Sequence, residues 1–285
     1  MKATRIASAL GAEVRGIRIA DVDEDAAREI EKLLWQHQVL FFPDQHPSID
    51  EHVAFGQHFG ELAGHPHLPN PESDNEKIFE LYGSRGGVAD EWHSDLTFKE
   101  QPSIYSILQM IECPEMGGDT LWATLYQVFE ELSPPLQDLC EGLSAIHNAR
   151  PHGRPEVMHA HPLVRIHPET GRKVLFVNEH FTRRIVELSR EESDNLLGYL
   201  TGLIAQPRFN LRYQWSNGTV AMWDNRCTQH SVLNDFEGER IIQRVTIMGD
   251  EVEGASPRWQ PYRHPRGKSD AFRRDRILRE YFGKD

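Results

Sequence analysis

The pattern of apolar and polar residues predicts three helices before the C-terminal tail. Residues 23–38 have the pattern of an amphipathic helix, with apolar side chains at Ala27, Ile30, Leu33 and Leu34. Two further helices are predicted by capping boxes, in which a serine is followed three residues later by a glutamate. They begin after Ser48 and Ser189 and extend to about residues 59 and 204.

Most other apolar residues fall in short runs separated by turn signals, which is typical of β-strands. The predicted strands include residues 39–42, 104–110, 164–167, 174–177, 219–223 and 241–248. The stretch Pro168-Glu169-Thr170-Gly171 has the composition of a hairpin turn between two of them. Short strands of this kind favour a sandwich or barrel over a parallel sheet. We therefore expect a mainly β protein with flanking helices, a jelly roll.

We expect one domain over residues 1–285, because the length fits a single large β-rich domain and no internal repeat or low-complexity linker divides it. The tail after about residue 254 is rich in proline, arginine and aspartate. This composition predicts an extended strap over residues 254–285, with a short basic helix near residues 270–282.

Composition restricts the cellular location and the partners. The chain is 39% hydrophobic and 26% charged, and no apolar run approaches the ~18 residues that span a bilayer. The N-terminus lacks the apolar core of a secretion signal, so we expect a cytoplasmic protein. A net charge of −13 disfavours a nucleic acid or an anionic membrane as partner. A homodimer and a homotetramer are both compatible with these properties. The three scattered cysteines predict neither a disulfide framework nor a thiolate metal site.

His93 and Asp95, in the stretch DEWHSDLTF, are candidate metal ligands. With 15 histidines and 44 acidic residues among 285, chance alone gives 15 × 44/285, or about 2.3, such triplets, and the chain has two. The other triplet, at residues 167–169, overlaps the predicted hairpin turn. On a strand, residues i and i+2 point to the same side, so His93 and Asp95 could bind one ion together.

An Fe(II) site suits two imidazoles and one carboxylate on one face of the metal. The third ligand is then expected from a distant strand, and His230 is the candidate because it follows an apolar strand and a polar turn in AMWDNRCTQHSV. Periodicity alone does not choose between His230 and five other histidines, which are His147, His152, His159, His161 and His180.

Arg240 and Arg244 stand four residues apart at the predicted strand 241–248. On a strand they share a face with Ile242 and Thr246, with their Cα atoms about 13 Å apart. This spacing suits two anions bound around one metal, and the alternative is an edge strand with solvated basic side chains. Residues 117–118, Gly-Gly, predict a turn, and a phosphate loop is disfavoured because no Gly-Lys-Ser/Thr follows.

Nine stretches of the chain occur in a characteristic order. They are HQVLFFPDQ, FGELAGHP, EWHSDLTF, GGDTLW, LSPPLQDLCEGL, HPLVRIHPETGRK, LFVNEHFT, WDNRCTQH and RIIQRVTIMGD. Over about residues 8–250 they resemble the TauD/TfdA (taurine dioxygenase) family of Fe(II)- and 2-oxoglutarate-dependent oxygenases. The resemblance implies a double-stranded β-helix, which is a jelly roll, and the iron ligands His93, Asp95 and His230. It also implies that Arg240 pairs with the far carboxylate of 2-oxoglutarate and that Thr120 adds a hydrogen bond.

The same resemblance implies a pocket for an anionic primary substrate, whose charged head would be held by Arg244 and His65. Phe181, in NEHF, corresponds to a wall of this pocket. The taurine-specific members carry a tyrosine, an asparagine and a phenylalanine where this chain has Leu68, Ala89 and Ala149. These replacements predict a roomier, more apolar pocket that no longer grips a small ammonium group.

The predicted function is therefore the hydroxylation of a small anionic organic compound with Fe(II), 2-oxoglutarate and dioxygen, giving succinate and carbon dioxide. A sulfonate, an alkyl sulfate, and an aryloxyalkanoate or other carboxylate are the candidate substrates. Three alternatives are a taurine dioxygenase proper, a zinc hydrolase with the same three ligands, and a non-catalytic cupin-like binding protein. The hydrolase leaves Arg240 and the GGDT stretch without a role.

Overall fold

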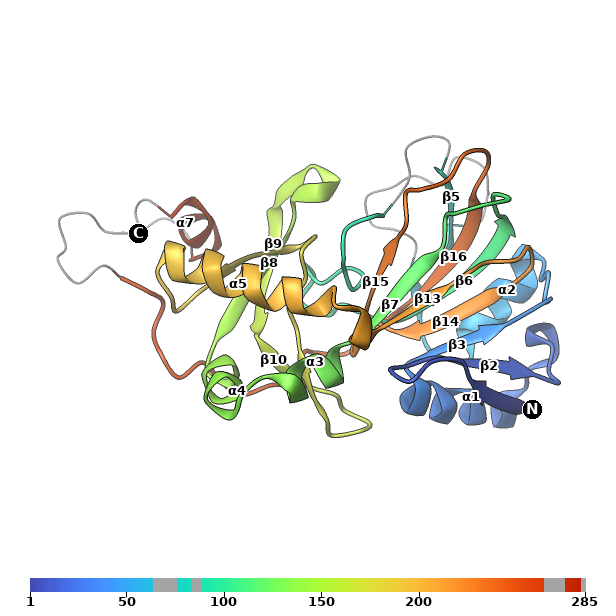
Figure 1. The fold of residues 1–285 in the computed structure, drawn as a ribbon, viewed down its shortest axis with the longest axis horizontal. Coiled ribbons are helices and arrows are strands. Elements are labelled where there is room, and N and C mark those ends of the chain that lie inside the picture. The colour runs from blue at the N-terminus through green and yellow to red at the C-terminus, as the bar shows by residue number, and fades with distance from the viewer. Residues whose placement is uncertain (64–75, 84–88, 264–274, 283–285) are drawn as a thin grey trace. The chain divides into compact units, whose positions relative to one another are not determined.

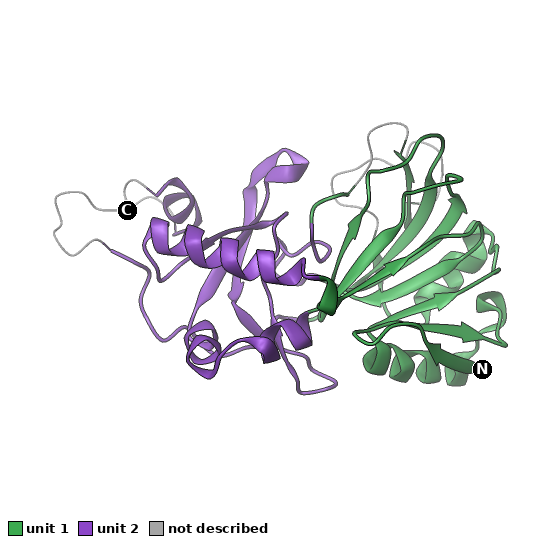
Figure 2. Cartoon of the chain, in the orientation of Figure 1, with its two compact units in different colours: residues 1–91, 103–124, 207–250 green, residues 92–102, 125–206, 251–285 purple. Residues whose placement is uncertain are grey.

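The computed structural model describes residues 1–63, 76–83, 89–263 and 275–282, and the chain forms two compact units (Figure 2). Unit 1 comprises residues 1–91, 103–124 and 207–250, and unit 2 comprises residues 92–102, 125–206 and 251–285. Each unit has sheets and helices of its own (Figure 1). The single domain over residues 1–285 stays a prediction.

Unit 1 contains an eight-stranded sheet that is antiparallel except where β2 pairs with β3. Its strands are, in spatial order, β1 (Lys2–Arg5), β2 (Ala12–Arg15), β3 (Val39–Phe42), β14 (Val220–Asp224), β6 (Ser103–Glu112), β16 (Ile241–Met248) and β4 (Leu62–Ala63), with β5 (Ile78–Tyr82) also paired to β16. The predicted strands at 39–42, 104–110, 219–223 and 241–248 are confirmed, since β3, β6, β14 and β16 occupy those positions.

A second sheet of unit 1 faces the first and closes the jelly roll that the sequence predicts. It contains β13 (Asn210–Tyr213), β7 (Thr120–Thr124) and β15 (Thr228–Val232), in that order. Trp122 on β7 and Phe41 on β3 lie edge to face with ring centroids 5.2 Å apart, and both are buried. The apolar interior between the sheets therefore joins side chains from both of them.

The other face of the eight-stranded sheet is covered by α1 (Glu24–His37) and α2 (Ile49–Gln57). Asp23 caps α1, because its carboxylate accepts a hydrogen bond from the amide of Ala26. The predicted capping box at Ser48 is present at the start of α2. Both predicted helices are thus confirmed, and α2 ends two residues earlier than expected.

One tight turn carries the chain from the main sheet to the second sheet of the jelly roll. Asp224 ends β14, and Thr228 begins β15 and donates a hydrogen bond from its hydroxyl to the carbonyl oxygen of Asp224. The carboxylate of Asp224 accepts bonds from the backbone amide, Nε and Nη2 of Arg226, at 2.8–2.9 Å. Both side chains are buried, so the turn is built around an ion pair that water does not reach.

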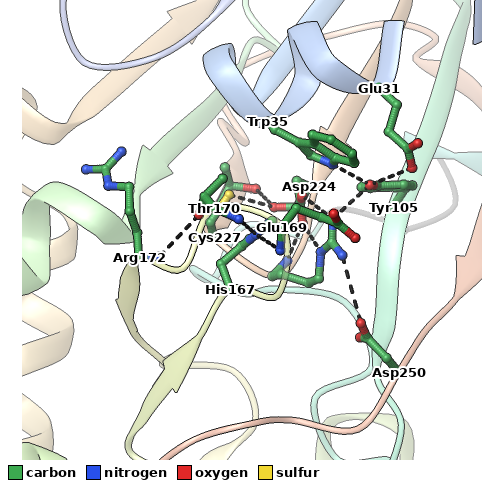
Figure 3. A network of polar contacts seen from close by, with 12 residues as sticks. Glu31, Trp35, Tyr105, His167, Glu169, Thr170, Arg172, Asp224, Cys227 and Asp250 are labelled. Carbon is green, nitrogen blue, oxygen red and sulfur yellow. Dashed lines mark hydrogen bonds and ion pairs between the residues drawn. The ribbon is translucent and has the colours of Figure 1, made fainter. Parts of the chain in front are cut away.

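Tyr105 joins this ion pair to helix α1 (Figure 3). Its hydroxyl accepts hydrogen bonds from Arg226 Nη2 and from Trp35 Nε1 and donates one to the carboxylate of Glu31. Burial lowers the pKa of Arg226, but the charge and hydrogen bonds of Asp224 outweigh burial and hold the pKa above its ordinary value. The turn between the sheets is therefore anchored to the helix layer.

Unit 2 surrounds two small antiparallel sheets with helices. One sheet has the order β12 (Thr182–Ile185), β8 (Ser144–Ala149) and β9 (Arg154–Pro162), and the other pairs β10 (Val164–Ile166) with β11 (Lys173–Leu175). The helices are α3 (Leu125–Glu131), α4 (Pro134–Glu141), α5 (Arg190–Ile204) and α7 (Arg276–Phe282). The predicted hairpin of residues 164–177 and the capping box at Ser189 are both present.

Residues 251–263 run along unit 2 and contain no helix. Gly254 forms a bridge with Arg165, and the amide of Tyr262 donates to the carbonyl of Val186. Further on, the buried carboxylate of Asp275 accepts a hydrogen bond from Arg184 Nε at 2.6 Å. The strap over residues 254–285 stays a prediction, and α7 covers the end of the predicted basic helix.

Among the helices of the described residues, none is both long and apolar enough to cross a membrane.

His52 on α2 generates a prediction about acid stability. The ring is fully buried and its Nε2 lies 3.1 Å from the carbonyl oxygen of Ile107. Burial lowers the pKa of His52 to about 4, from an ordinary value of about 6.5. Between pH 6.5 and 4 the His52 imidazole is protonated in the unfolded chain and neutral in the folded protein. The free energy of unfolding therefore falls as pH drops from 6.5 towards 4. The contribution is up to about 1.4 kcal/mol per pH unit for one proton.

His52→Gln keeps a hydrogen-bond donor but does not titrate in this range. We expect a flatter decline of the free energy of unfolding between pH 6.5 and 4 than in the wild type. Urea unfolding followed by tryptophan fluorescence at several pH values measures both slopes. Equal slopes would show that His52 is not the group that resists protonation.

Candidate metal and co-substrate site

His93 and Asp95 lie in unit 2, in a short segment that leads into a turn. His93 occupies a β-bridge position, and the chain then turns through Leu96, whose φ is +56°. The prediction that both residues lie on one strand is wrong, because no strand includes Asp95. The side chains nevertheless converge, with Nε2 of His93 and Oδ1 of Asp95 3.8 Å apart and both almost fully buried.

Aromatic rings pack beside His93 in unit 2. The ring of His180 lies 5.3 Å and that of Phe181 6.2 Å from the His93 ring, centroid to centroid. Phe98 stacks edge to face on Phe181 at 5.1 Å, and both phenylalanines are buried. Phe181, the predicted pocket wall, is therefore part of an apolar surround for the His93 side chain.

His230 lies in unit 1, in the middle of β15, as the pattern of strand and turn predicted. It pairs in register with Trp122 on β7, and its ring lies 4.8 Å from that of Trp223. It is 5% exposed. Ala89 lies near the end of the same strand, where its carbonyl oxygen accepts a hydrogen bond from the amide of Val232.

The five competing histidines all lie in unit 2. His147 and His161 are buried and have hydrogen-bond partners around Thr97. His152, His159 and His180 are half-buried and pack against other rings.

Arg240 precedes β16 and is buried, with 3% of its surface exposed. Its Nε donates to the carbonyl oxygen of Gly118 at 3.0 Å, and its Nη2 donates to the hydroxyl of Thr120 at 3.4 Å. Among the described residues no carboxylate forms an ion pair with it, so the acceptors of this guanidinium are neutral oxygens. Burial lowers the pKa of Arg240 to about 10, which leaves the side chain charged at neutral pH.

Thr120 completes the surroundings of Arg240. Its hydroxyl oxygen accepts hydrogen bonds from Arg240 and from Trp215 Nε1, the latter at 2.9 Å. With both lone pairs engaged, the hydroxyl hydrogen is left to donate to a further acceptor. A carboxylate placed here meets a cation and a hydrogen-bond donor together.

The turn at residues 117–118, as predicted, brings the backbone close to Arg240. Gly117 and Gly118 have φ values of +77° and +67°, a conformation that glycine adopts without strain. A Cβ on Gly118 would lie 3.2 Å from Cδ of Arg240. The glycine therefore lets its carbonyl reach the arginine.

Arg244 has a different environment from Arg240, although both were expected on one face of one strand. It lies within β16, is half-buried, and its guanidinium lies 5.6 Å from the ring centroid of Phe79. A register shift between Ile241 and Ile242 lies between the two arginines, so strand alternation does not run unbroken from Arg240. His65 and Leu68, also predicted to contact substrate, lie outside the described residues.

Comparison with known proteins decides the family. A model of the taurine catabolism dioxygenase TauD, TfdA family matches residues 2–246. The chain belongs to this family. It is therefore a 2-oxoglutarate-dependent non-haem iron dioxygenase that uses Fe(II), 2-oxoglutarate and dioxygen, as the sequence predicted.

Several individual relatives align with most of this chain. An alkylsulfatase of Acinetobacter baylyi is 34% identical, over 88% of this chain and 86% of the relative. An alpha-ketoglutarate-dependent sulfonate dioxygenase of Saccharomyces cerevisiae is 36% identical, over 88% of this chain and 70% of the relative. The crystal structure of a taurine dioxygenase from Burkholderia xenovorans superimposes with a TM-score of 0.81 at 32% identity, over 90% and 94% of the two chains.

Two residues of the dioxygenase near the predicted site were not predicted from the sequence. Trp215 bonds to Thr120, and its indole gives no motif by which it could be recognised. Thr97 follows the predicted ligand pair by two residues and is contacted by several side chains. Its position beside EWHSD was the available signal.

Proposed function

We propose that this dioxygenase hydroxylates small organic anions with an apolar body, with alkyl sulfates and sulfonates as the first choice and aryloxyalkanoates as the second. Relatives described as an alkylsulfatase, a sulfonate dioxygenase and a sulfate ester dioxygenase are 33–36% identical. Relatives that act on phenoxypropionate and 2,4-dichlorophenoxyacetate are 28% and 32% identical. All of these compounds are anions.

The observation that supports a 2-oxoglutarate site in this chain, and with it the oxygenase reaction, is the buried guanidinium of Arg240. A buried charge is costly unless an opposite charge accompanies it, and Arg240 has only neutral acceptors among the described residues. A dicarboxylate fits this environment, because the arginine fork can take one carboxylate in bidentate fashion while Thr120 donates to it. The zinc hydrolase and the binding protein give Arg240 no comparable role.

We propose His93, Asp95 and His230 as the iron ligands. Two imidazoles and one carboxylate are a donor set that suits Fe(II), and all three side chains are buried. Bound Fe(II), with 2-oxoglutarate and dioxygen, supplies the oxidation that converts a substrate C–H bond into C–OH.

The chain's own residues bind and orient the reactants. Arg240 and Thr120 hold the far carboxylate of 2-oxoglutarate. Arg244 and His65 bind the head of the primary substrate. Phe181 and its aromatic neighbours exclude water beside His93.

Metal binding gives the most direct test. Anaerobic addition of Fe(II) and 2-oxoglutarate should produce a weak visible charge-transfer band, and His93→Ala should abolish it. His58→Ala, which changes an exposed histidine on unit 1, should leave the band unchanged. A wild-type protein that gives no band and binds no 2-oxoglutarate by calorimetry would contradict the proposal.

Arg240→Gln tests the co-substrate site. A charge-assisted contact of roughly 1.5–3 kcal/mol is lost, so the KM for 2-oxoglutarate should rise by about tenfold to a hundredfold. Arg208→Gln, an exposed arginine of unit 1, is the matched control. An unchanged KM in Arg240→Gln would show that another residue binds the far carboxylate of 2-oxoglutarate, and Arg244 would be the next candidate.

Substrate preference is tested by comparing kcat/KM for taurine with that for alkyl sulfonates, alkyl sulfates and aryloxyalkanoates. A pocket without groups for the ammonium leaves that charge unpaired, while added methylenes cost little. Taurine should therefore be the poorer substrate. Arg244→Ala should weaken all the anions and leave the affinity for 2-oxoglutarate nearly intact. A preference for taurine of about tenfold or more would make the protein an ordinary taurine dioxygenase.

A further inference from the structure

The segment that follows the proposed ligands His93 and Asp95 is held by side chains rather than by strand pairing. The chain turns at Leu96, and the amide of Lys99 donates to the Leu96 carbonyl at 3.0 Å. Thr97, at the centre of this turn, is 1% exposed. Its hydroxyl and its carbonyl oxygen both have partners from distant parts of unit 2.

His161 on β9 holds the backbone of the turn. Its Nε2 lies 3.0 Å from the carbonyl oxygen of Thr97 and 2.9 Å from that of Lys99. Two carbonyl acceptors require that Nε2 carries the hydrogen, so His161 donates to both oxygens in this tautomer. The ring is 2% exposed and lies 5.5 Å from the ring of Phe176. The backbone between positions 97 and 99 is thereby fixed to a strand.

Asn178 and His147 hold the side chain of Thr97. The Nδ2 of Asn178 donates to the Thr97 hydroxyl at 3.1 Å, and Nδ1 of His147 lies 3.0 Å from the same oxygen. Both residues are buried. Thr97 thus joins the turn to the loop that carries Asn178 and to β8.

Asn178 also fixes the position of Phe181. Its Oδ1 accepts a hydrogen bond from the amide of Phe181 at 2.7 Å. The side chain of Asn178 therefore bonds through Nδ2 to the turn after Asp95 and through Oδ1 to the backbone amide of Phe181, whose ring packs beside His93. A movement of Thr97 would therefore change the position of both the turn after Asp95 and Phe181.

We propose that Thr97, His161 and Asn178 are positioning residues that hold His93 and Asp95 at the separation needed to bind the metal, and that hold Phe181 beside them. This inference rests on the proposed function, because it assumes that His93 and Asp95 are metal ligands. Residues that orient metal ligands from behind matter nearly as much as the ligands themselves, and their loss commonly weakens metal binding by about tenfold to a hundredfold. Thr97 is two residues from Asp95 and lies in the turn that follows it.

The test is a set of Co(II) and Fe(II) titrations on three variants of the full chain under anaerobic conditions, followed by calorimetry and by the Co(II) visible absorption. Thr97→Val keeps the shape of the side chain and removes the hydroxyl. We expect it to weaken metal binding by about tenfold or more and to change the Co(II) spectrum. Thr97→Ser restores the hydroxyl and should bind metal nearly as the wild type does.

Ser193→Ala is the matched control in the same unit. The Ser193 hydroxyl is fully buried and accepts a hydrogen bond from the amide of Ile185, away from the turn at Thr97. Its removal should lower Tm and leave the metal Kd and the Co(II) spectrum unchanged. This control separates a loss of general stability from a loss of positioning.

The result that would overturn the inference is a Thr97→Val protein with a lowered Tm but the metal Kd and Co(II) spectrum of the wild type. If Thr97→Val does not fold, His161→Gln and His161→Leu replace it. Glutamine still donates hydrogen bonds to the two carbonyls, so it should retain metal affinity that leucine loses. Equal affinity in these two variants would also overturn the inference.

Failure of the underlying function has a different signature. In that case the wild type binds no metal at this site, or His93→Ala binds it as well as the wild type does. Loss of affinity in His93→Ala, together with unchanged affinity in Thr97→Val, would keep the proposed function and remove only the role of Thr97.

Discussion

The jelly roll of unit 1 depends on the buried ion pair between Asp224 and Arg226. The pair shapes the only residues between β14 in the main sheet and β15 in the second sheet, so it sets where the chain leaves one sheet and enters the other. Removing one partner of a buried pair leaves the other charge buried without compensation, and this commonly lowers the free energy of unfolding by about 3–5 kcal/mol. The register of β15, and with it the position of His230, follows from this turn.

Two buried guanidinium groups of unit 1, those of Arg226 and Arg240, have opposite electrostatic environments. Arg226 is surrounded by a carboxylate and a tyrosine hydroxyl, so its charge is compensated within the protein. Arg240 is just as buried but has a carbonyl and a hydroxyl as its acceptors. The first arrangement is that of a structural ion pair. The second has no opposite charge among the described residues, and this supports the proposal that a co-substrate carboxylate binds there.

Elements with a strong local signal could be predicted from the sequence. The capping boxes at Ser48 and Ser189 were found because two side chains three residues apart fix a helix start. The strand of residues 39–42 was found because a run of four apolar residues ends at a proline. The prediction that His93 and Asp95 lie on one strand was wrong. The turn after them is held by side chains from β8 and β9, and sequence spacing does not show these contacts.

The site residues divide in the same way. Arg240, Thr120 and His230 could be named because motifs mark them and their strands have clear patterns. The different surroundings of Arg240 and Arg244 could not be predicted. A register shift within β16 changes the alternation of its side chains, and no residue type marks that shift. Trp215 was beyond reach, since only folding brings its indole to Thr120.

The order of strands in the main sheet has a consequence for synthesis on the ribosome. β6 lies in the sheet between β14 and β16, yet it is complete at Glu112, while its two neighbours begin only at Val220 and Ile241. At roughly 5–20 residues per second, the long apolar strand β6 waits about 5–20 s for its first partner. During that time both of its edges can pair with other chains. Yield in cells should therefore depend on chaperones that cover the nascent strand.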